Sequence, residues 1–344
     1  MSKVRIGIVG AGQRVCNHGG CVFRNCGRAL QVAALCDVHS GRLSEAKRKY
    51  EQQFGYEIGT YADYVEMYEQ AQLDGVYIAA PNYLHKDIAV AAFEHGLHVL
   101  CEKPLSVTLA DCDAMIAASQ KAGKVFGAAM QMHYRKRYHK VRELIDEGLV
   151  GHPAMLWCTE YRGPFPKAMS WVHRTEKSGG ALVEKNCHHY DILNLWAQSD
   201  PTTVYASGNT LKHKVMGGER SEIIDNAWVV SDYASGARAM VGICFLGRDK
   251  SHRREFGVQG TEGKVWFSSE DSEVIHFEST SGETEDFTIN EDLRGGVFKD
   301  FVECMQTGKQ PLVTPEMARR SLLVPLAAER SMREKRIVDV AELA

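Results

Sequence analysis

Short apolar runs alternate with amphipathic stretches over the first 130 residues of the chain. Clustered apolar residues predict strands over 6–9, 32–35, 75–79, 98–100 and 125–128. Helical spacing predicts helices over 42–53, 86–95 and 111–121, with Thr108 as the N-cap of the last. Short strands that alternate with helices are typical of a doubly wound parallel sheet covered on both faces. We therefore predict an α/β domain over residues 1–130.

The pattern changes after residue 130. A helix is predicted over 139–147, where Gly148 ends it, and further helices over 294–306 and 315–333. Strand character without intervening helices covers residues 154–162, 203–210, 226–233, 237–245, 254–259 and 264–267. Consecutive strands joined by turns favour an open, mostly antiparallel sheet. Residues 131–344 are therefore predicted to form an α+β domain, whose last helix is a candidate to pack back on the first domain.

Chain length, net charge and the cysteine pattern narrow the class of protein. A chain of 344 residues is too long for one hydrophobic core, which favours two domains. A net charge of −3 gives no general attraction to nucleic acid or anionic membranes, and no apolar run approaches a membrane span. The first residues already form a strand, so no signal peptide is expected, and the scattered cysteines suit free thiols in a reducing cytoplasm. Cys16, Cys21 and Cys26 lack a metal-binding spacing, and we expect no metal site.

The first predicted strand ends in a glycine turn that is typical of dinucleotide binding. Gly10 permits the tight turn, and Gly12 lets backbone amides at a helix N-terminus approach a pyrophosphate. Asp37 ends the second strand, where a carboxylate can accept hydrogen bonds from the adenosine ribose and would repel a 2′-phosphate. NAD is therefore preferred, although the nearby Arg42 leaves NADP possible. Val15 departs from the small residue usual at the sixth motif position, and a sharp turn without a ligand is the alternative interpretation.

A second candidate follows the strand predicted over 98–100. The segment Cys101-Glu102-Lys103-Pro104 comes directly after it. Residues just past the carboxyl end of a parallel strand face the crevice where ligands bind, so Lys103 brings a cation with three donors there. Pro104 restricts Lys103 to an extended conformation. A surface lysine at a strand end is the alternative.

The third candidate is a helix that follows a Ser-Gly-Gly segment at 178–180, which is predicted to be flexible. Glu184, His188 and Asp191 recur at i, i+4 and i+7, so they share one helix face. A histidine between two acids is a candidate proton-transfer group, because one carboxylate can fix its tautomer and raise its basicity. A salt-linked helix surface is one alternative. A zinc site of Glu184, His188 and His189 is disfavoured, because His189 points away from His188 by about 100°.

Together these residues resemble the Gfo/Idh/MocA oxidoreductases, named after glucose–fructose oxidoreductase and inositol dehydrogenase. The resemblance is collinear over nearly the whole chain. It rests on the Gly-Ala-Gly turn, Asp37, Ala79-Ala80-Pro81-Asn82 with His85, Glu102-Lys103-Pro104 and the Gly-Gly…Glu…His…Asp helix. It implies an NAD-binding Rossmann domain over 1–130 and a domain over 131–344 that binds substrate and forms homodimers or homotetramers through its sheet. It also implies an active site between them, where NAD or NADP oxidises or reduces a carbinol carbon of a sugar or cyclitol.

The resemblance also assigns roles to single residues. His188 is expected to take the hydroxyl proton while Lys103 stabilises the developing alkoxide. Glu184, which stands where most relatives have aspartate, or Asp191 would steady the imidazole or bind a neighbouring hydroxyl. The residues expected to bind the cofactor are Gly10, Gly12, Gln13, Arg14, Asp37, Arg42, Ala80, Pro81, Asn82, His85, Glu102 and Lys103.

Residues 161–174 carry the only hints about the substrate. Aromatic faces suit sugar rings, and cations suit a carboxylate, phosphate or sulfonate, so an acidic sugar or anionic glycoside is expected. The residues expected to bind the substrate are Lys103, Arg162, Lys167, Trp171, Arg174 and His188. A solvated loop with a tucked Trp171 is the alternative.

Two other functions use the same residues. A redox-neutral, NAD-dependent glycoside hydrolase would oxidise a sugar carbon, eliminate the aglycone, add water and return the hydride. Such an enzyme leaves no free NADH, whereas a dehydrogenase produces NADH in proportion to product. A nucleotide-sensing regulator on the same scaffold is disfavoured, because a sensor has no need of both Lys103 and His188.

Overall fold

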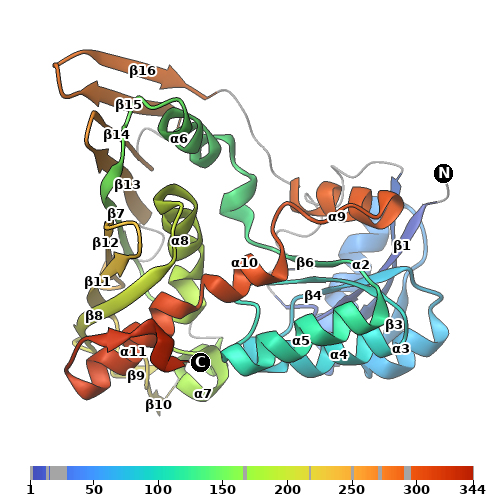
Figure 1. The fold of residues 1–344 in the computed structure, drawn as a ribbon. Coiled ribbons are helices and arrows are strands. Elements are labelled where there is room, and N and C mark those ends of the chain that lie inside the picture. The colour runs from blue at the N-terminus through green and yellow to red at the C-terminus, as the bar shows by residue number, and fades with distance from the viewer. Residues whose placement is uncertain are drawn as a thin grey trace. The chain divides into compact units, whose positions relative to one another are not determined.

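The computed structural model describes residues 3–12, 15, 29–165, 169–216, 218–248, 252–269, 273–289 and 296–343 (Figure 1). The chain divides into two compact units. The first unit consists of Met1–Tyr134 and Leu293–Arg319, and the second of Arg135–Asp292 and Arg320–Ala344. The segment 293–319 therefore rejoins the first unit after the whole intervening chain. The roles assigned to the two domains stay predictions.

The first unit contains a six-stranded, fully parallel sheet in the order β3-β2-β1-β4-β5-β6. Its strands are β1 Val4–Val9, β2 Leu30–Cys36, β3 Gly59–Tyr61, β4 Gly75–Ile78, β5 His98–Cys101 and β6 Phe126–Ala128. The five predicted strands are confirmed, and β3 was missed because it is a short edge strand with no buried residue. Every residue of β4 is buried, as expected where both faces of a parallel sheet are covered.

Helices cover this sheet. They are α2 Ser40–Phe54, α3 Tyr64–Gln70, α4 His85–Glu94, α5 Leu109–Ala122, α9 Gly296–Thr307 and α10 Pro315–Arg320, with short 3₁₀ turns η3 Asn82–Leu84 and η4 Gln131–Tyr134. Figure 1 shows α3, α4 and α5 together on one side of the sheet and α9 on the other. The predicted cap is confirmed, since the Thr108 hydroxyl oxygen accepts the Asp111 N–H at 3.1 Å. The doubly wound α/β fold is therefore confirmed.

The second unit contains a nine-stranded sheet in the order β16-β15-β14-β13-β7-β12-β11-β8-β17. These strands are β7 Pro153–Arg162, β8 Pro201–Asn209, β11 Asn226–Tyr233, β12 Arg238–Cys244, β13 His252–Gly260, β14 Gly263–Ser268, β15 Val274–Ser279, β16 Thr284–Thr288 and β17 Val338–Asp339. A separate hairpin pairs β9 Val215–Met216 with β10 Glu219–Arg220. Neighbouring strands are antiparallel except β7 and β12, which run parallel. The predicted mostly antiparallel sheet is confirmed.

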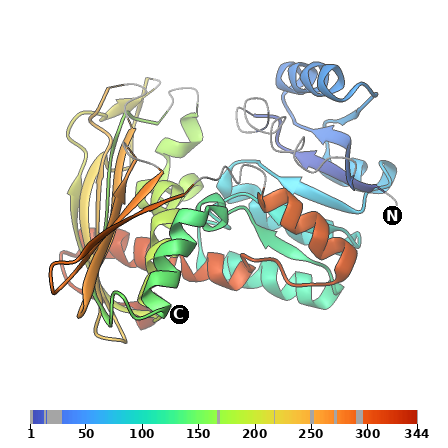
Figure 2. The same ribbon diagram turned by 90° about the horizontal axis from the view of Figure 1, so that it is seen from above.

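The helices of this unit are α6 Lys136–Asp146, α7 Thr175–Ser178, α8 Ala181–Ala197 and α11 Leu323–Glu334, with 3₁₀ turns η5 Ser170–His173 and η6 Val340–Leu343. Figure 2 shows α6 and α8 on one side of the sheet. The helix predicted over 315–333 is interrupted, because α10 ends at Arg320 and α11 begins at Leu323. None of the helices in the described ranges is both long enough and apolar enough to cross a membrane.

The core of the second unit lies between α8 and the sheet. Trp196 at the end of α8 is fully buried, and its indole N–H donates to the Tyr138 carbonyl at 2.9 Å. Its ring packs edge-on against Phe256 and Phe267 of the neighbouring strands. Because α8 contacts β7, α6 and α11, residues on nearly all of its sides are buried. This packing holds α8 as a rigid element over the sheet.

The other face of this sheet carries exposed apolar side chains. Strand pairing places Trp157, Met240, Val230 and Tyr205 in one row across β7, β12, β11 and β8. Tyr205, Val230 and Met240 are 48%, 41% and 39% exposed, so the row is an uncovered apolar surface. We call this row the outer-face row.

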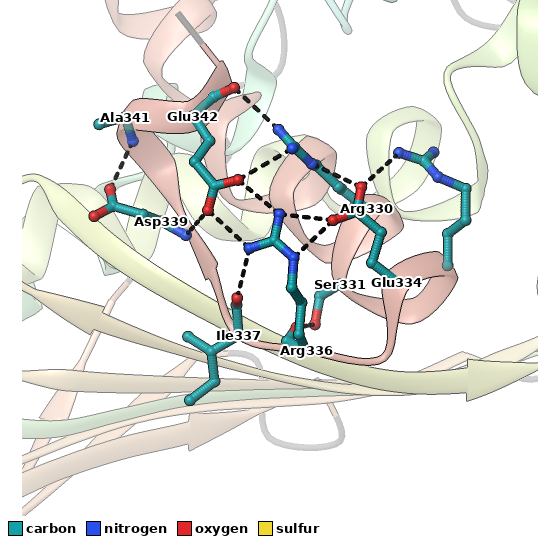
Figure 3. A network of polar contacts seen from close by, with 9 residues as sticks. Arg330, Ser331, Glu334, Arg336, Ile337, Asp339, Ala341 and Glu342 are labelled. Carbon is teal, nitrogen blue, oxygen red and sulfur yellow. Dashed lines mark hydrogen bonds and ion pairs between the residues drawn. The ribbon is translucent and has the colours of Figure 1, made fainter.

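A network of charged residues ties the C-terminal tail to α11 (Figure 3). Arg336 binds the Glu342 carboxylate through two nitrogens, at 2.8 and 2.6 Å, and Glu334 at 2.7 Å. Arg330 joins the same two acids. The Arg336 guanidinium lowers the pKa of Glu342 to about 2. The tail thereby places β17 against β8 and covers this sheet edge.

Candidate functional site

The carboxyl edge of the parallel sheet holds the first part of the candidate site. β1 and β4 are neighbours at the point where the strand order reverses, which is where open α/β sheets bind ligands. Gly10 has φ +98°, and a Cβ there would lie 2.6 Å from the backbone carbonyl of Ala79. Only glycine fits this position. A Cβ at Gly12 would meet no described atom within 4 Å.

Asp37 joins the glycine turn to the end of β2. One carboxylate oxygen accepts the Ala11 N–H at 2.8 Å. The other accepts the His39 N–H at 2.8 Å and a guanidinium N–H of Arg42 at 3.1 Å. The Asp37 side chain is 7% exposed and that of Arg42 is 51% exposed. A buried carboxylate and an accessible guanidinium therefore stand side by side at the end of β2.

His85 joins the loops that follow β4 and β5. One ring nitrogen lies 2.9 Å from the Ala80 carbonyl oxygen, and the other 3.0 Å from that of Pro104. The ring is completely buried, and burial lowers its pKa. His85 therefore fixes the loop at Ala80 relative to the loop that carries Lys103.

Glu102 is a buried anchor directly before Lys103. The Tyr77 hydroxyl on β4 donates to one carboxylate oxygen at 2.5 Å, and the Lys103 backbone N–H donates to the other at 3.2 Å. The side chain of Glu102 is thus held by the neighbouring strand. Lys103 itself is partly exposed, and its peptide bond to Pro104 is cis.

The predicted cofactor residues gather at this edge with few exceptions. The ends of β1, β2, β4 and β5 carry Gly10, Gly12, Asp37, Ala80, Pro81, Glu102 and Lys103, and Asn82 and His85 begin the segment after β4. Arg42 lies in the first turn of α2. Gln13 and Arg14 lie outside the described residues. Val15, which replaces the small residue usual at the sixth position of the glycine motif, is completely buried and packs as a core residue.

The second part of the candidate site is α8. The helix is continuous over Glu184, His188 and Asp191, as their spacing requires for a common face. Glu184 and Asp191 are buried, at 9% and 4% exposure, while His188 is partly exposed. An accessible imidazole thus lies between two buried carboxyl groups along one helix. Lys103 belongs to the first unit and α8 to the second.

The Ser-Gly-Gly segment before α8 is packed, whereas the sequence suggested flexibility. Ser178, Gly179 and Gly180 are all buried. A Cβ at Gly179, which has φ +79°, would lie 2.6 Å from the Val183 side chain. The glycines therefore permit close packing at the start of the helix.

Sequence reasoning missed Glu160, a completely buried acid on β7. Its carboxylate lies 3.2 Å from the Lys185 ammonium, 3.0 Å from His189 Nε2 and 2.5 Å from His252 Nε2. Burial raises the pKa of Glu160, but Lys185 and His189 outweigh burial and hold it well below 4.5. The signal was present, because Leu156, Cys158 and Glu160 alternate as the inward-facing positions of the strand.

His189 faces Glu160 on β7. It is therefore distinct in its surroundings from the neighbouring His188, which is the predicted proton-transfer residue. Its Nδ1 accepts from the Asn186 side-chain amide at 2.6 Å, which leaves Nε2 to carry the proton toward Glu160. Burial lowers the pKa of His189 to about 4, so the ring is neutral near pH 7. Within the described ranges, no group of three or more histidine, cysteine, aspartate or glutamate side chains is arranged to hold a metal ion.

Two cations of the predicted substrate segment already have partners inside the second unit. The Arg162 guanidinium lies over the rings of Phe165 and Phe245, at 5.6 and 5.8 Å from their centroids. Arg174 forms an ion pair with Glu222 at 3.2 Å. Trp171 is partly exposed in η5, and Lys167 lies outside the described residues.

Comparison with protein-family models matches both parts of the chain. Residues 4–130 match the family described as "Oxidoreductase family, NAD-binding Rossmann fold", GFO_IDH_MocA. Residues 138–266 match the "GFO/IDH/MocA C-terminal domain". The two matches cover the sheet of the first unit and most of the sheet of the second.

Individual relatives extend over the same regions. The chain is 27% identical to "Myo-inositol 2-dehydrogenase" of Thermotoga maritima, over 99% of each protein. It is 31% identical to "Inositol 2-dehydrogenase" of Salmonella paratyphi B, over 72% of this chain and 69% of the relative. Among solved structures, a probable dehydrogenase from Thermotoga maritima is similar with a TM-score of 0.80 and 25% identity, over 98% of this chain and 100% of that one.

Proposed function

Because the chain belongs to the GFO/IDH/MocA oxidoreductase family, with its NAD-binding Rossmann fold, we propose that it transfers a hydride between NAD and a hydroxyl-bearing carbon. The substrate is a sugar, sugar acid, glycoside or cyclitol. Two separate observations support this proposal: a lysine follows directly after β5 in the first unit, and an accessible histidine lies between two buried carboxyls on α8 in the second. Relatives named inositol dehydrogenases support a cyclitol or sugar as substrate.

The residues at the edge of the parallel sheet fit the dinucleotide. Gly10 leaves no space for a side chain at the turn, and a glycine at position 12 lets a pyrophosphate approach the backbone closely. Asp37 would accept hydrogen bonds from the adenosine ribose, while His85 acts by holding the two loops that face the cofactor. When bound, NAD supplies the hydride acceptor.

Lys103 and His188 act on the same hydroxyl group in this proposal. His188 removes the hydroxyl proton as a general base. The Lys103 ammonium donates to the oxygen and stabilises the negative charge that develops on it. Glu184 and Asp191 lie on the same helix face, where a carboxylate can fix the imidazole tautomer or bind a neighbouring hydroxyl.

The partners of Arg162 and Arg174 bear on the choice of substrate. Both cations are engaged within the second unit, one with aromatic rings and one with Glu222. An uncharged polyol is therefore the first substrate to test, and an acidic sugar the second. In either case Trp171 and Lys167 remain proposed substrate contacts.

We propose that the outer-face row mediates self-association into a dimer or tetramer. Tyr205, Val230 and Met240 form an exposed apolar strip across neighbouring strands, which suits burial against a second copy of the same strip. The described cysteines are free thiols, and all but Cys244 are buried. Such thiols are typical of a reducing compartment, so we propose a cytoplasmic location.

Turnover assays with a panel of polyols, acidic sugars and glycosides test the proposal. The enzyme is expected to produce NADH in proportion to product, and His188→Asn to lose turnover by about 10²-fold or more. NAD affinity should not change in this variant, because His188 lies on α8 of the second unit, whereas the residues proposed to bind NAD belong to the first. Cleavage of a glycoside without net NADH would instead indicate the redox-neutral hydrolase.

A further inference from the structure

The first turn of α8 is capped by a residue from a different helix. The residue before the helix is Gly180, which has no side chain to accept a hydrogen bond. The Glu329 carboxyl on α11 instead accepts a hydrogen bond from the Leu182 backbone amide. The Ser178 hydroxyl accepts the Gly180 N–H at 3.1 Å. Two of the amides that a helix start leaves without helical partners are thus satisfied from outside the helix.

The space for Glu329 exists only because position 180 is glycine. Gly180 has φ +94°, and a Cβ there would lie 2.4 Å from one Glu329 carboxylate oxygen and 2.8 Å from its carboxyl carbon. An alanine would therefore collide with the carboxyl group in addition to straining the backbone. The second glycine of the motif and the acid on α11 form one complementary pair, although 149 positions separate them along the printed sequence.

The carboxyl end of Glu329 is buried, although the residue as a whole is partly exposed. Its Oε1 atom is buried without a hydrogen-bond partner among the described residues. Burial raises the pKa of Glu329 to about 7, although the Leu182 amide and Arg333 both lower it. On the α8 side, the charge of Glu329 contributes to the raised pKa of the buried Tyr190 hydroxyl. A carboxyl group at this place changes its charge near neutral pH.

We propose that Glu329 is a positioning residue for α8: its carboxyl caps the helix through Gly180 and Leu182 and fixes the placement of Glu184 and His188. A negative charge at a helix N-terminus is favoured by the helix dipole, which adds to the hydrogen bond. Capping of α8 stands on the contacts alone. Its effect on catalysis rests on the proposed function of His188.

Amide hydrogen exchange tests the cap without any substrate. Peptides that cover residues 181–188 are followed in the intact wild type, Glu329→Ala, Glu329→Gln and the matched control Glu334→Gln. Glu334 lies on the same helix in the exposed network of Figure 3. We expect about fivefold faster exchange in Glu329→Ala, the factor for loss of a typical cap. Glu329→Gln should stay near wild type, because its amide oxygen also accepts the Leu182 N–H. Unchanged exchange in Glu329→Ala, or an equal change in Glu334→Gln, would overturn the proposal.

A double-variant cycle covers the case in which Glu329→Ala folds poorly. Gly180→Ala should lower the melting temperature more than Gly236→Ala, because Gly236 also has positive φ but a Cβ there meets no described atom. Adding Glu329→Ala to Gly180→Ala removes the collision, so the double variant should lose less than the sum of the two single losses. Strictly additive losses would contradict the contact between the two residues.

A pH profile separates positioning from a general contribution to stability. The ratio of wild-type to Glu329→Gln turnover should change between about pH 6 and pH 8, since only the wild type has a carboxyl proton at position 329 to lose there. KM for NAD should be equal in both. A constant ratio would leave Glu329 without influence on the reaction. If the wild type itself has no dehydrogenase activity while the exchange result holds, the proposed function fails and the cap stands.

Discussion

The two units hold their buried carboxylates in different ways. Asp37 in the first unit is held by the Ala11 N–H of the glycine turn, 26 positions earlier, and by His39 and Arg42 within the next five residues. Glu160 in the second unit is held by Lys185 and His189 of α8 and by His252 of β13, which is 92 positions away. The partners of Asp37 belong to a recognisable sequence motif, whereas those of Glu160 are brought together only in the folded chain.

This contrast predicts which substitutions change activity and which change the stability of the fold. In the first unit, the partly exposed Lys103 is presented at a strand end, where a substitution changes chemistry but removes little packing. In the second unit, Glu160 is completely buried and Glu329 has a buried carboxyl oxygen, so their removal takes partners away from buried groups. We therefore expect variants of the first kind to fold normally and variants of the second kind to lose stability.

The largest effect is expected for Lys103→Met. Turnover should fall by about 10³-fold, because the developing alkoxide loses its charged donor. The melting temperature and the affinity for NAD should stay close to wild type, since Met retains the apolar stem of the partly exposed side chain. Steady-state kinetics, thermal unfolding and NAD titration check these three quantities. Retained turnover would exclude Lys103 from the reaction.

Glu160→Ala should show the opposite behaviour. Loss of this carboxylate breaks a buried ion pair with Lys185, which costs about 3–5 kcal/mol of unfolding free energy. The exposed Glu278, paired with Lys264 on neighbouring strands, is the matched control and should cost about 1 kcal/mol or less on substitution by alanine. Denaturant unfolding at neutral pH measures both. Equal losses would remove the distinction between the two kinds of carboxylate.

Glu160 also predicts how stability depends on pH. Its folded pKa lies well below the ordinary value of 4.5, so its contribution is complete above that pH and is lost as the pH falls toward the folded pKa. His189 acts in the same direction below about pH 6.5, since its folded pKa of about 4 lets the unfolded chain bind a proton first. Glu329 acts oppositely, and its contribution falls as the pH rises from 4.5 to about 7. Unfolding curves of Glu160→Gln and Glu329→Gln should therefore diverge from wild type at opposite ends of the range from pH 4 to pH 7.

Asp37→Ala should give a smaller change that is confined to the cofactor. Loss of the carboxylate weakens NAD binding by about tenfold and frees the Arg42 guanidinium to pair with a 2′-phosphate. NADP binding should tighten in the same variant. Fluorescence titration with both dinucleotides gives the ratio of affinities. An unchanged ratio would show that Asp37 serves only the turn at Ala11.

Met240→Lys is expected to have the smallest effect on the folded monomer. The change places a charge in the outer-face row, so self-association should weaken by about tenfold or more, while the unfolding free energy changes by about 0.5 kcal/mol. Sedimentation velocity over a concentration series measures the association. The control is Thr288→Lys on the edge strand β16, outside the row. Equal association in wild type and Met240→Lys would place the interface elsewhere.

The sequence predicted the first unit well because its signals are local. Buried runs marked β1, β2, β4, β5 and β6, and the cap at Thr108 was readable from a single residue. The short edge strand β3 was missed, since it buries nothing. β15 and β16 of the second unit were missed too, as β16 is mostly exposed and carries two acids within five residues.

The supports of α8 were beyond local reasoning. The spacing of Glu184, His188 and Asp191 predicted a helix with a shared face, and the structure has that helix. It did not predict that Glu160 and Glu329 approach the same helix from β7 and α11. Gly180 was interpreted as flexible because its reason for being glycine, the Glu329 carboxyl, comes from the far end of the chain.

The most direct test follows the near-ultraviolet absorbance of NADH while the purified protein converts a polyol, with the product measured in the same sample. We predict NADH in proportion to oxidised product, and loss of both in His188→Asn. Conversion of a glycoside with no net change in NADH, or a protein that never binds NAD, would contradict it.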